Sequence, residues 1–263
     1  MEKFFTKISR NRFSVPLILL EETMSTSGEA KAMRLAGREP PFIVLAKKQL
    51  AGYGQRGRAW RGDVPGNLYL SLALKKNSGF EKKLGIFPQH IALELCESFH
   101  HRYAADCMVK WPNDIFAHSK KMGGLLVETS WIGGNVTEMV LGIGINILFA
   151  PNIEKQAYLA TCLADVSKTQ IDFDSAAEEC ISVILNAVES FENISAGSIC
   201  EKWKQFDMLR EQNIELSIRD GRICGENYGI GEQGELLICA ADGKIARFNN
   251  GNAEIRLGGE FKP

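Results

Sequence analysis

A glycine- and arginine-rich segment, residues 52–60 (GYGQRGRAW), lies between the apolar runs 42–46 and 67–74 and limits the folds that this chain can adopt. Both runs have the composition of buried strands. Glycine lets backbone N–H groups approach a ligand closely, and arginine adds a fixed charge with forked hydrogen-bond donors. The segment is therefore predicted to be an ordered loop over an anionic ligand. A surface hairpin loop with solvated arginines is an equally weighted alternative.

Three of these glycines, Gly52, Gly54 and Gly57, also match the dinucleotide-binding pattern G-x-G-x-x-G, which must open a helix. Residues 62–66 (GDVPG) follow, and their glycines and proline cannot propagate a helix. The dinucleotide interpretation is therefore rejected.

Composition excludes several classes of protein. The chain has 263 residues, 45% hydrophobic and 24% charged, which suits one large domain plus a small one. A formal net charge of −1 argues against wholesale binding to nucleic acid or a membrane surface. The apolar run 15–20 is too short to span a bilayer and lacks a cleavage site, so no signal peptide or membrane anchor is expected.

Seven cysteines without C-x-x-C spacing indicate reduced thiols and a cytoplasmic location. The histidines at 90, 100 and 101 are interpreted as surface or helix-end residues, because no zinc-binding spacing accompanies them.

Apolar spacing predicts the main helices and strands. Residues 88–103 form an amphipathic helix, and residues 175–193 form a second one behind a Ser175-x-x-Glu178 capping box. A hydroxyl cluster precedes a third helix at 29–36, where an N-cap is the simplest interpretation. Residues 120–128 and 136–147 are predicted to form a hairpin whose second strand contains glycines, which allow a ligand to approach closely.

The last part of the chain has a different sequence pattern from the rest. Short β-like runs are separated by the Asp-Gly pairs at 220–221 and 242–243, which favour hairpins. The fold class is therefore predicted to be α+β, with domains at 1–207 and 208–263, the second a small antiparallel barrel.

Four motifs then occur in order: G-x-G-x-R-G-R-x-W at 52–60, KWPND at 110–114, KMGGLLVE at 121–128 and GIGIN at 142–146. Together they resemble the biotin protein ligase family from about residue 15 to the end. The resemblance implies a class II synthetase-like catalytic domain with a mixed sheet and flanking helices, followed by an SH3-like barrel. It also implies that ATP activates biotin as biotinyl-5′-AMP and that a lysine of a carboxylase carrier domain then accepts the biotin.

The residue types suit that chemistry. An anionic carboxylate attacks an anionic phosphate, so cations must neutralise both, and Arg58, Arg56 and Lys121 are available. Mg²⁺ prefers oxygen ligands, which Asp114 and Asn146 offer. Taken alone, Asp114 would more simply be a turn residue and Asn146 a strand-end hydrogen-bonder. Lys121, Arg58 and Asp114 are assigned as catalytic, and Asp114 and Asn146 as metal ligands.

The substrate-binding residues implied by the resemblance lie in the motifs or in the hydroxyl cluster, except Gln49, which lies just before the first motif. Neutral hydrogen-bonding side chains in this set suit an uncharged ureido ring. Trp60 is predicted to pack near the adenylate, with a plain core role as a close alternative. The set is Ser25, Thr26, Ser27, Gln49, Gly52, Gly54, Gln55, Arg56, Gly57, Trp60, Lys110, Asn113, Gly123, Gly124, Gly144 and Asn146.

The chain departs from the family pattern in the loop. Tyr53 and Gln55 replace two arginines, and Ser27 stands where asparagine is usual. These changes put retention of the adenylate in doubt and leave a non-catalytic biotin-binding protein as one alternative. A lipoate protein ligase is the other. The short stretch before Ser25 leaves no room for the winged helix-turn-helix of repressor-type ligases, and a homodimer through a sheet edge stays open.

Overall fold

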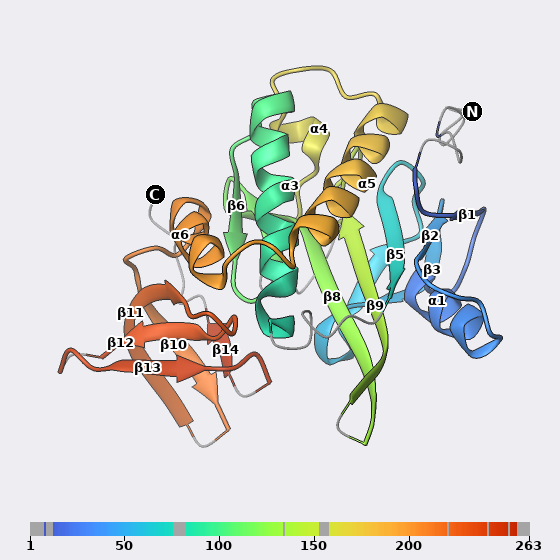
Figure 1. The fold of residues 1–263 in the computed structure, drawn as a ribbon. Helices are drawn as coiled ribbons and strands as arrows, with labels where there is room; N and C mark the ends of the chain where they lie inside the picture. The colour runs from blue at the N-terminus through green and yellow to red at the C-terminus, as the bar shows by residue number, and fades with distance from the viewer. Residues whose placement is uncertain are drawn as a thin grey trace.

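The computed structural model describes Ile8 and residues 13–75, 83–133, 135–152, 158–219, 221–240, 242–251 and 253–256. A seven-stranded mixed sheet forms its centre, in the order β1-β2-β5-β9-β8-β7-β6 (Figure 1). Only β1 and β2 run parallel, and the other pairs are antiparallel. The strands are β1 (Leu17–Leu20), β2 (Phe42–Ala46), β5 (Leu68–Leu74), β6 (Cys107–Lys110), β7 (Asp114–Ala117), β8 (Lys120–Ile132) and β9 (Asn135–Ile145).

Both faces of this sheet are covered, which explains why β2 and β5 are continuous apolar runs. Alternate residues of β2 point to opposite faces: Phe42 and Val44 pack beneath α1 (Thr26–Leu35), whereas Ile43 and Leu45 join the main core. On that second face lie α3 (Phe87–Tyr103), α5 (Phe173–Ser190) and α6 (Ala196–Phe206) (Figure 1). Short elements complete this part: η2 (Leu84–Ile86) and α4 (Leu163–Val166).

The helix predictions are confirmed, with corrections at two positions. The helix expected at 175–193 begins earlier, because the carboxylate of Asp172 accepts the backbone N–H of Ser175 at 3.1 Å and acts as the N-cap. The predicted capping box at Ser175 is therefore wrong. His90 was expected at the surface, but it is only 1% exposed and stacks on Phe191, since it lies on the face of α3 that packs against α5.

The C-terminal strands form a separate antiparallel sheet in the order β13-β12-β11-β10-β14 (Figure 1). Its strands are β10 (Asn213–Ile218), β11 (Gly221–Ile230), β12 (Leu236–Cys239), β13 (Ile245–Phe248) and β14 (Ala253–Arg256). Within the described residues, β13 and β14 are not paired with each other, so the structure shows an open five-stranded sheet where a barrel was expected. Asp220 lies outside the described residues.

Asp207 joins the two sheets at the predicted domain boundary. Its buried carboxylate accepts hydrogen bonds from Trp203 Nε1 at 2.9 Å, Asn227 Nδ2 at 2.8 Å and the backbone of Leu209 at 3.0 Å. Burial raises the pKa of this carboxyl, and the three donors oppose the shift. The C-terminal sheet is thus held to α6 by a satisfied buried polar group, while the boundary at 207/208 itself stays a prediction.

Candidate active site

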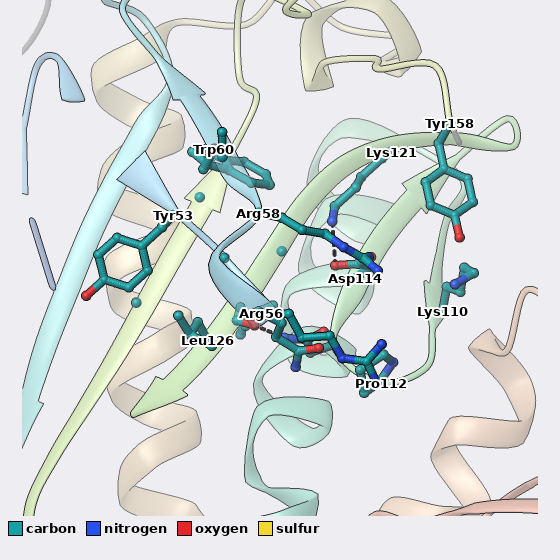
Figure 2. A pocket seen from close by; sticks show the side chains of 18 of the residues that line it. Tyr53, Arg56, Arg58, Trp60, Lys110, Pro112, Asp114, Lys121, Leu126 and Tyr158 are labelled. Atoms are coloured by element: carbon teal, nitrogen blue, oxygen red, sulfur yellow. Dashed lines mark hydrogen bonds and ion pairs between the residues drawn. The ribbon is translucent and has the colours of Figure 1, made fainter. Parts of the chain in front are cut away.

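A cavity of about 790 Å³ lies against β8 and β9 and extends to the C-terminal sheet. The start of α1 and the hairpin of β3 (Gln49–Tyr53) and β4 (Ala59–Gly62) supply other walls (Figure 2). The structure brings together nearly all of the predicted site residues here, including Lys121, Arg58 and Asp114. The exceptions are Gly52, Gly57 and Gly123, which do not line the cavity.

One end of the cavity carries neutral polar groups that bond to one another. The side-chain oxygen of Gln49 accepts the backbone N–H of Thr26 at 2.8 Å and its hydroxyl at 3.1 Å. Ser71 Oγ lies 2.8 Å from Thr26 Oγ1 and 2.9 Å from Ser27 Oγ. All four side chains are buried. A hydroxyl keeps unused donor or acceptor capacity, so this end can still bind a neutral polar ligand group.

Ser25 has a structural role in addition to its place in the cavity. Its hydroxyl caps α1 by accepting the N–H of Gly28 at 3.4 Å, while the residue also lines the cavity. The N-cap interpretation of the hydroxyl cluster is thereby confirmed for Ser25.

The glycines of the motifs create space for side chains. Gly124 and Gly144 are paired across β8 and β9. A Cβ on Gly144 would lie 2.3 Å from the Trp60 ring, and one on Gly124 would lie 3.4 Å from it. At Gly142, a Cβ would lie 2.7 Å from the hydroxyl of Ser27. Any larger residue at 142 or 144 would therefore force the cavity wall to move.

Trp60 rests against these glycines and lines the cavity (Figure 2). Its indole Nε1 is buried without a hydrogen-bond partner in the described structure, and Lys121 Nζ lies 5.6 Å from the ring centroid. Trp60 is thus a wall of the cavity rather than a residue of the hydrophobic core.

The opposite end of the cavity is charged. Lys121 Nζ forms an ion pair with Asp114 Oδ1 at 2.7 Å, between β8 and β7 (Figure 2). The backbone of Lys121 is fixed by bonds to Leu159 O at 2.8 Å and from Thr161 N at 2.9 Å. The cation is therefore well placed, but its charge is shared with a carboxylate.

Asn146 ends β9 at this charged end. Its Nδ2 donates to Thr161 O at 3.0 Å, whereas its Oδ1 is buried and has no partner among the described residues. An orphaned buried acceptor facing a cavity is an expected feature of a ligand or metal position. Asn113, in contrast, donates its amide to Leu125 O and so supports the turn between β6 and β7.

Lys110 also lines the cavity and, unlike Lys121, is buried, with 4% of its surface exposed. Burial lowers its pKa, and the charges of Asp114 and Glu254 oppose that shift. Its Nζ lies 5.1 Å from the ring centroid of Tyr158, a contact that favours the charged form of the amine. A desolvated cation of this kind favours binding of an anion.

The segment 52–60 forms a hairpin, as in the alternative prediction, but its Arg56 and Arg58 pair with Glu254 of the protein. β3 and β4 pair in antiparallel register around a short turn, η1 (Gln55–Gly57). Arg56 has φ of 56° and Gly57 has φ of 70°, so two consecutive residues take the left-handed conformation that reverses the chain.

The arginines of the hairpin reach the C-terminal sheet. Arg56 donates to Glu254 at 2.8 Å and to the carbonyls of Asn250 at 2.9 Å and Ala253 at 3.0 Å. Arg58 also pairs with Glu254. β14 thus forms part of the wall of the cavity beside the hairpin.

Residues that sequence reasoning missed include Tyr158 and Glu254, which line the cavity, and Ser71, whose hydroxyl contacts the lining residues Thr26 and Ser27. Ser71 is the one polar residue in the apolar strand 68–74, which is a usable indication of a polar site. Tyr158 and Glu254 lie in segments without a motif, and folding alone brings them to the cavity.

Two further observations bear on the kind of site. All seven cysteines are free thiols. In the described part of the chain, no helix has the length and hydropathy to cross a bilayer.

The geometry agrees with comparisons to known proteins. The model of the biotin/lipoate A/B protein ligase family matches residues 19–146. The bifunctional ligase/repressor BirA of Salmonella typhimurium is 30% identical over 215 residues, covering 81% of this chain and 66% of that protein. The biotin--[acetyl-CoA-carboxylase] ligase of Paracoccus denitrificans is 35% identical over 136 residues, which cover 51% of this chain and 55% of that protein.

A solved structure of the biotin protein ligase of Aquifex aeolicus in complex with biotin and ATP superposes with a TM-score of 0.78 at 26% identity. The alignment covers 94% of this chain and all (100%) of that one. The chain spans 66% and 65% of the lengths of the BirA proteins of Salmonella typhimurium and Escherichia coli. With its motifs gathered around one cavity, the chain belongs to the biotin/lipoate A/B protein ligase family.

Proposed function

We propose that the protein is an ATP-dependent biotin protein ligase that forms biotinyl-5′-AMP and transfers biotin to a lysine of a carboxylase carrier domain. The observation that carries this proposal is the division of one cavity into a neutral hydrogen-bonding end and a cationic end. Such a cavity suits a ligand with an uncharged polar head and an anionic tail that meets a phosphate. The Aquifex aeolicus relative that contains biotin and ATP supports the same assignment.

In the first step, the biotin carboxylate attacks the α-phosphate of ATP, the mixed anhydride forms and pyrophosphate leaves. Lys121, Arg58 and Lys110 neutralise the charge that accumulates as two anions approach. Lys121 must exchange part of its contact with Asp114 for the phosphate, and Arg58 part of its contact with Glu254. Substrate binding thereby converts contacts within the protein into contacts with the reacting groups.

Mg²⁺ fits the charged end. Asp114 Oδ1, on β7, and the unpartnered Oδ1 of Asn146, directly after β9, are hard oxygen donors, and both residues line the cavity. Mg²⁺ usually takes one or two protein oxygens and completes its shell with water and substrate phosphate. A bound Mg²⁺ would offset phosphate charge, while Lys121 and Asp114 would orient the phosphate.

In the second step, the amine of the acceptor lysine attacks the acyl carbon of the adenylate, an amide forms and AMP leaves. Until then the cavity must exclude water from the anhydride. The hairpin 49–62 and β14 line the cavity, and the Trp60 ring packs against Gly124 and Gly144, so these elements can limit the access of water. We assign the remaining predicted residues at the neutral end, Ser25, Thr26, Ser27 and Gln49, to the biotin head group.

The experiment incubates the protein with ATP, Mg²⁺ and a carboxyl carrier domain, together with biotin or lipoate, and measures the carrier by mass spectrometry. One biotin on one lysine is the expected result. Lipoylation would assign the protein to the lipoate branch of the family. An unmodified carrier with biotin bound to the protein would identify a binding protein without catalysis.

The free thiols of the buried cysteines also lead us to place this activity in the cytoplasm, where thiols stay reduced. Self-association through a sheet edge is a separate proposal that light scattering of the purified protein tests.

A further inference from the structure

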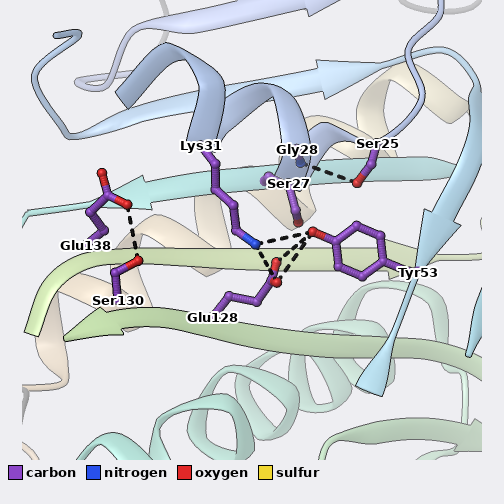
Figure 3. Close-up of polar contacts among 9 residues, drawn as sticks. Ser25, Ser27, Gly28, Lys31, Tyr53, Glu128, Ser130 and Glu138 are labelled. Carbon is purple, nitrogen blue, oxygen red and sulfur yellow. Dashed lines mark hydrogen bonds and ion pairs between the residues drawn. The ribbon is translucent and has the colours of Figure 1, made fainter. Parts of the chain in front are cut away.

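Tyr53 stands at a hairpin position where arginine is usual, and its hydroxyl points away from the charged end of the cavity (Figure 2). It meets Glu128 of β8, at 3.1 Å from Oε2 and 3.4 Å from Oε1. Lys31 of α1 binds Glu128 Oε1 at 2.5 Å and lies 3.4 Å from the Tyr53 hydroxyl (Figure 3). These three residues, here the Tyr53 cluster, join three elements that are distant in sequence.

The cluster is balanced in charge. Burial lowers the pKa of Lys31, but its hydrogen bond and ion pair with Glu128 outweigh burial, so the pKa is raised overall. Lys31 is therefore charged at neutral pH and compensates the carboxylate. The tyrosine hydroxyl serves as a donor to Glu128.

What faces the cavity is the ring of Tyr53, together with Leu126. An arginine at position 53 would add a cation to this wall. The tyrosine instead makes this part of the wall apolar, on the side of the cavity away from Lys121 and Asp114 (Figure 2). That surface suits an aliphatic part of the ligand.

The hairpin that carries Tyr53 needs such an anchor. β3 and β4 form a sheet of their own, and an isolated two-stranded hairpin is only marginally stable in water. At its base, Gln49 bridges to Thr23 and accepts hydrogen bonds from Thr26. At its tip, Arg56 binds Glu254. Leu50 N and Ala51 N also donate to the carbonyls of Thr23 and Met24, each at 2.9 Å, and the Tyr53 cluster is a further attachment toward the tip.

Building on the proposed function, we propose that Tyr53 is a positioning residue whose hydroxyl, held by Glu128 and Lys31, fixes β3 and the biotin-binding Gln49 before ligand binds. Through these contacts the cluster anchors the hairpin, while the ring of Tyr53 forms the apolar wall for the aliphatic part of the substrate. The substrate class is a carboxylic acid with an uncharged polar head and a flexible alkyl chain.

The first test needs no catalysis. Hydrogen exchange of the β3–β4 backbone is measured in the ligand-free protein and in Tyr53→Phe and Glu128→Gln. Both variants should exchange roughly three- to tenfold faster in the hairpin, as expected for loss of one partly exposed hydrogen bond to a charged group. Ser130→Ala is the matched control, since it removes a 3.2 Å bond to Glu138 farther along β8 and away from the cavity (Figure 3). Its hairpin exchange should equal that of the unchanged protein.

The cation is tested with a conservative pair. Lys31→Arg retains the charge and should keep the exchange rate of the unchanged protein. Lys31→Met leaves Glu128 uncompensated and should accelerate exchange in the same hairpin amides.

The second test separates binding from chemistry. In Tyr53→Phe and Glu128→Gln, the KM for biotin should rise roughly three- to tenfold, while kcat at saturating biotin stays within about twofold. The KM for biotin of the double variant should not exceed that of the more affected single variant, because both changes act on the contact between Tyr53 and Glu128.

The results can contradict the proposal in distinct ways. Unchanged hairpin exchange in both variants overturns it, and so does equal acceleration across the whole sheet, which would mean a general loss of stability. If the protein does not bind biotin, the proposed function fails, but the exchange measurement still decides whether the Tyr53 cluster anchors the hairpin.

Discussion

The two ends of the cavity are built in opposite ways. At the neutral end, Thr26, Gln49 and Ser71 are buried and hydrogen-bonded through uncharged groups. At the charged end, Lys121 and Arg58 are partly exposed, and each is paired with a carboxylate of the protein. The first arrangement is rigid and keeps hydrogen-bonding capacity, whereas the second must be rearranged by the substrate.

This difference suggests a division of labour. Neutral hydrogen bonds contribute similarly to the ground state and the transition state, so they set affinity. Cations directed at a reacting phosphate gain most as charge develops, so they set rate. Substitutions at the neutral end should therefore alter the KM for biotin, and substitutions at the charged end should alter kcat.

The largest expected effect is that of Lys121→Ala. Removing this cation leaves phosphate and carboxylate charge unpaired, and loss of one such group typically costs about 3 to 4 kcal/mol, or about 10² to 10³ in rate. Biotin-dependent release of pyrophosphate measures the effect. Release at the rate of the unchanged protein would remove Lys121 from the mechanism.

Gln55→Arg should have the opposite effect at the charged end and strengthen retention of the adenylate. Gln55 lies at the turn of the hairpin, lines the cavity and replaces a charge-assisted contact that an arginine would make, typically worth about 1.5 to 3 kcal/mol. The variant should release biotinyl-5′-AMP about ten- to a hundredfold more slowly. The dissociation rate of the adenylate is measured, with labelling of non-carrier lysines followed alongside. Equal rates would mean that Arg56 already fills this role.

Gln49→Ala tests the neutral end. It removes one buried acceptor that organises Thr26 and one potential contact to the ligand. Neutral hydrogen bonds are worth about 0.5 to 1.5 kcal/mol, so the biotin affinity should fall about two- to tenfold in calorimetry. ATP affinity should not change, and a matching loss of ATP binding would show that the two ends are not separable.

The smallest effect is expected for Glu254→Gln. The carboxylate pairs with Arg56 and Arg58, which are exposed enough for solvent to screen the ion pairs. Freeing the arginines should change the KM for ATP by about two- to threefold and increase protease cleavage within residues 52–60. Identical proteolysis with and without the substitution would show that β14 does not restrain the hairpin.

The sequence predicted the elements that are defined by local pattern. The apolar spacing of α3 and α5 and the Asp-Gly turn at 242–243 follow from short stretches of chain, and the structure contains them. The polar motifs also reach one cavity as predicted, because β8 and β9 pair directly and bring Gly124 beside Gly144.

Long-range pairing was beyond the sequence pattern. No local pattern indicates that Glu254 contacts Arg56, which lies 198 positions away in the sequence. The two strands of the hairpin at 49–62 were also not predicted, since they are short, interrupted by glycine and anchored by side chains from other elements. Asp172 displaced Ser175 as the helix cap because its carboxylate accepts both the N–H and the hydroxyl of Ser175.

The most direct measurement is biotin-dependent exchange of pyrophosphate into ATP, compared between Gln49→Ala and Lys121→Ala across a range of biotin concentrations. Saturating biotin should restore the exchange rate of Gln49→Ala to that of the unchanged protein. The exchange rate of Lys121→Ala should stay lower by a factor of about 10² to 10³ at saturation. No biotin-dependent exchange in the unchanged protein, or recovery of Lys121→Ala by excess biotin, would contradict this prediction.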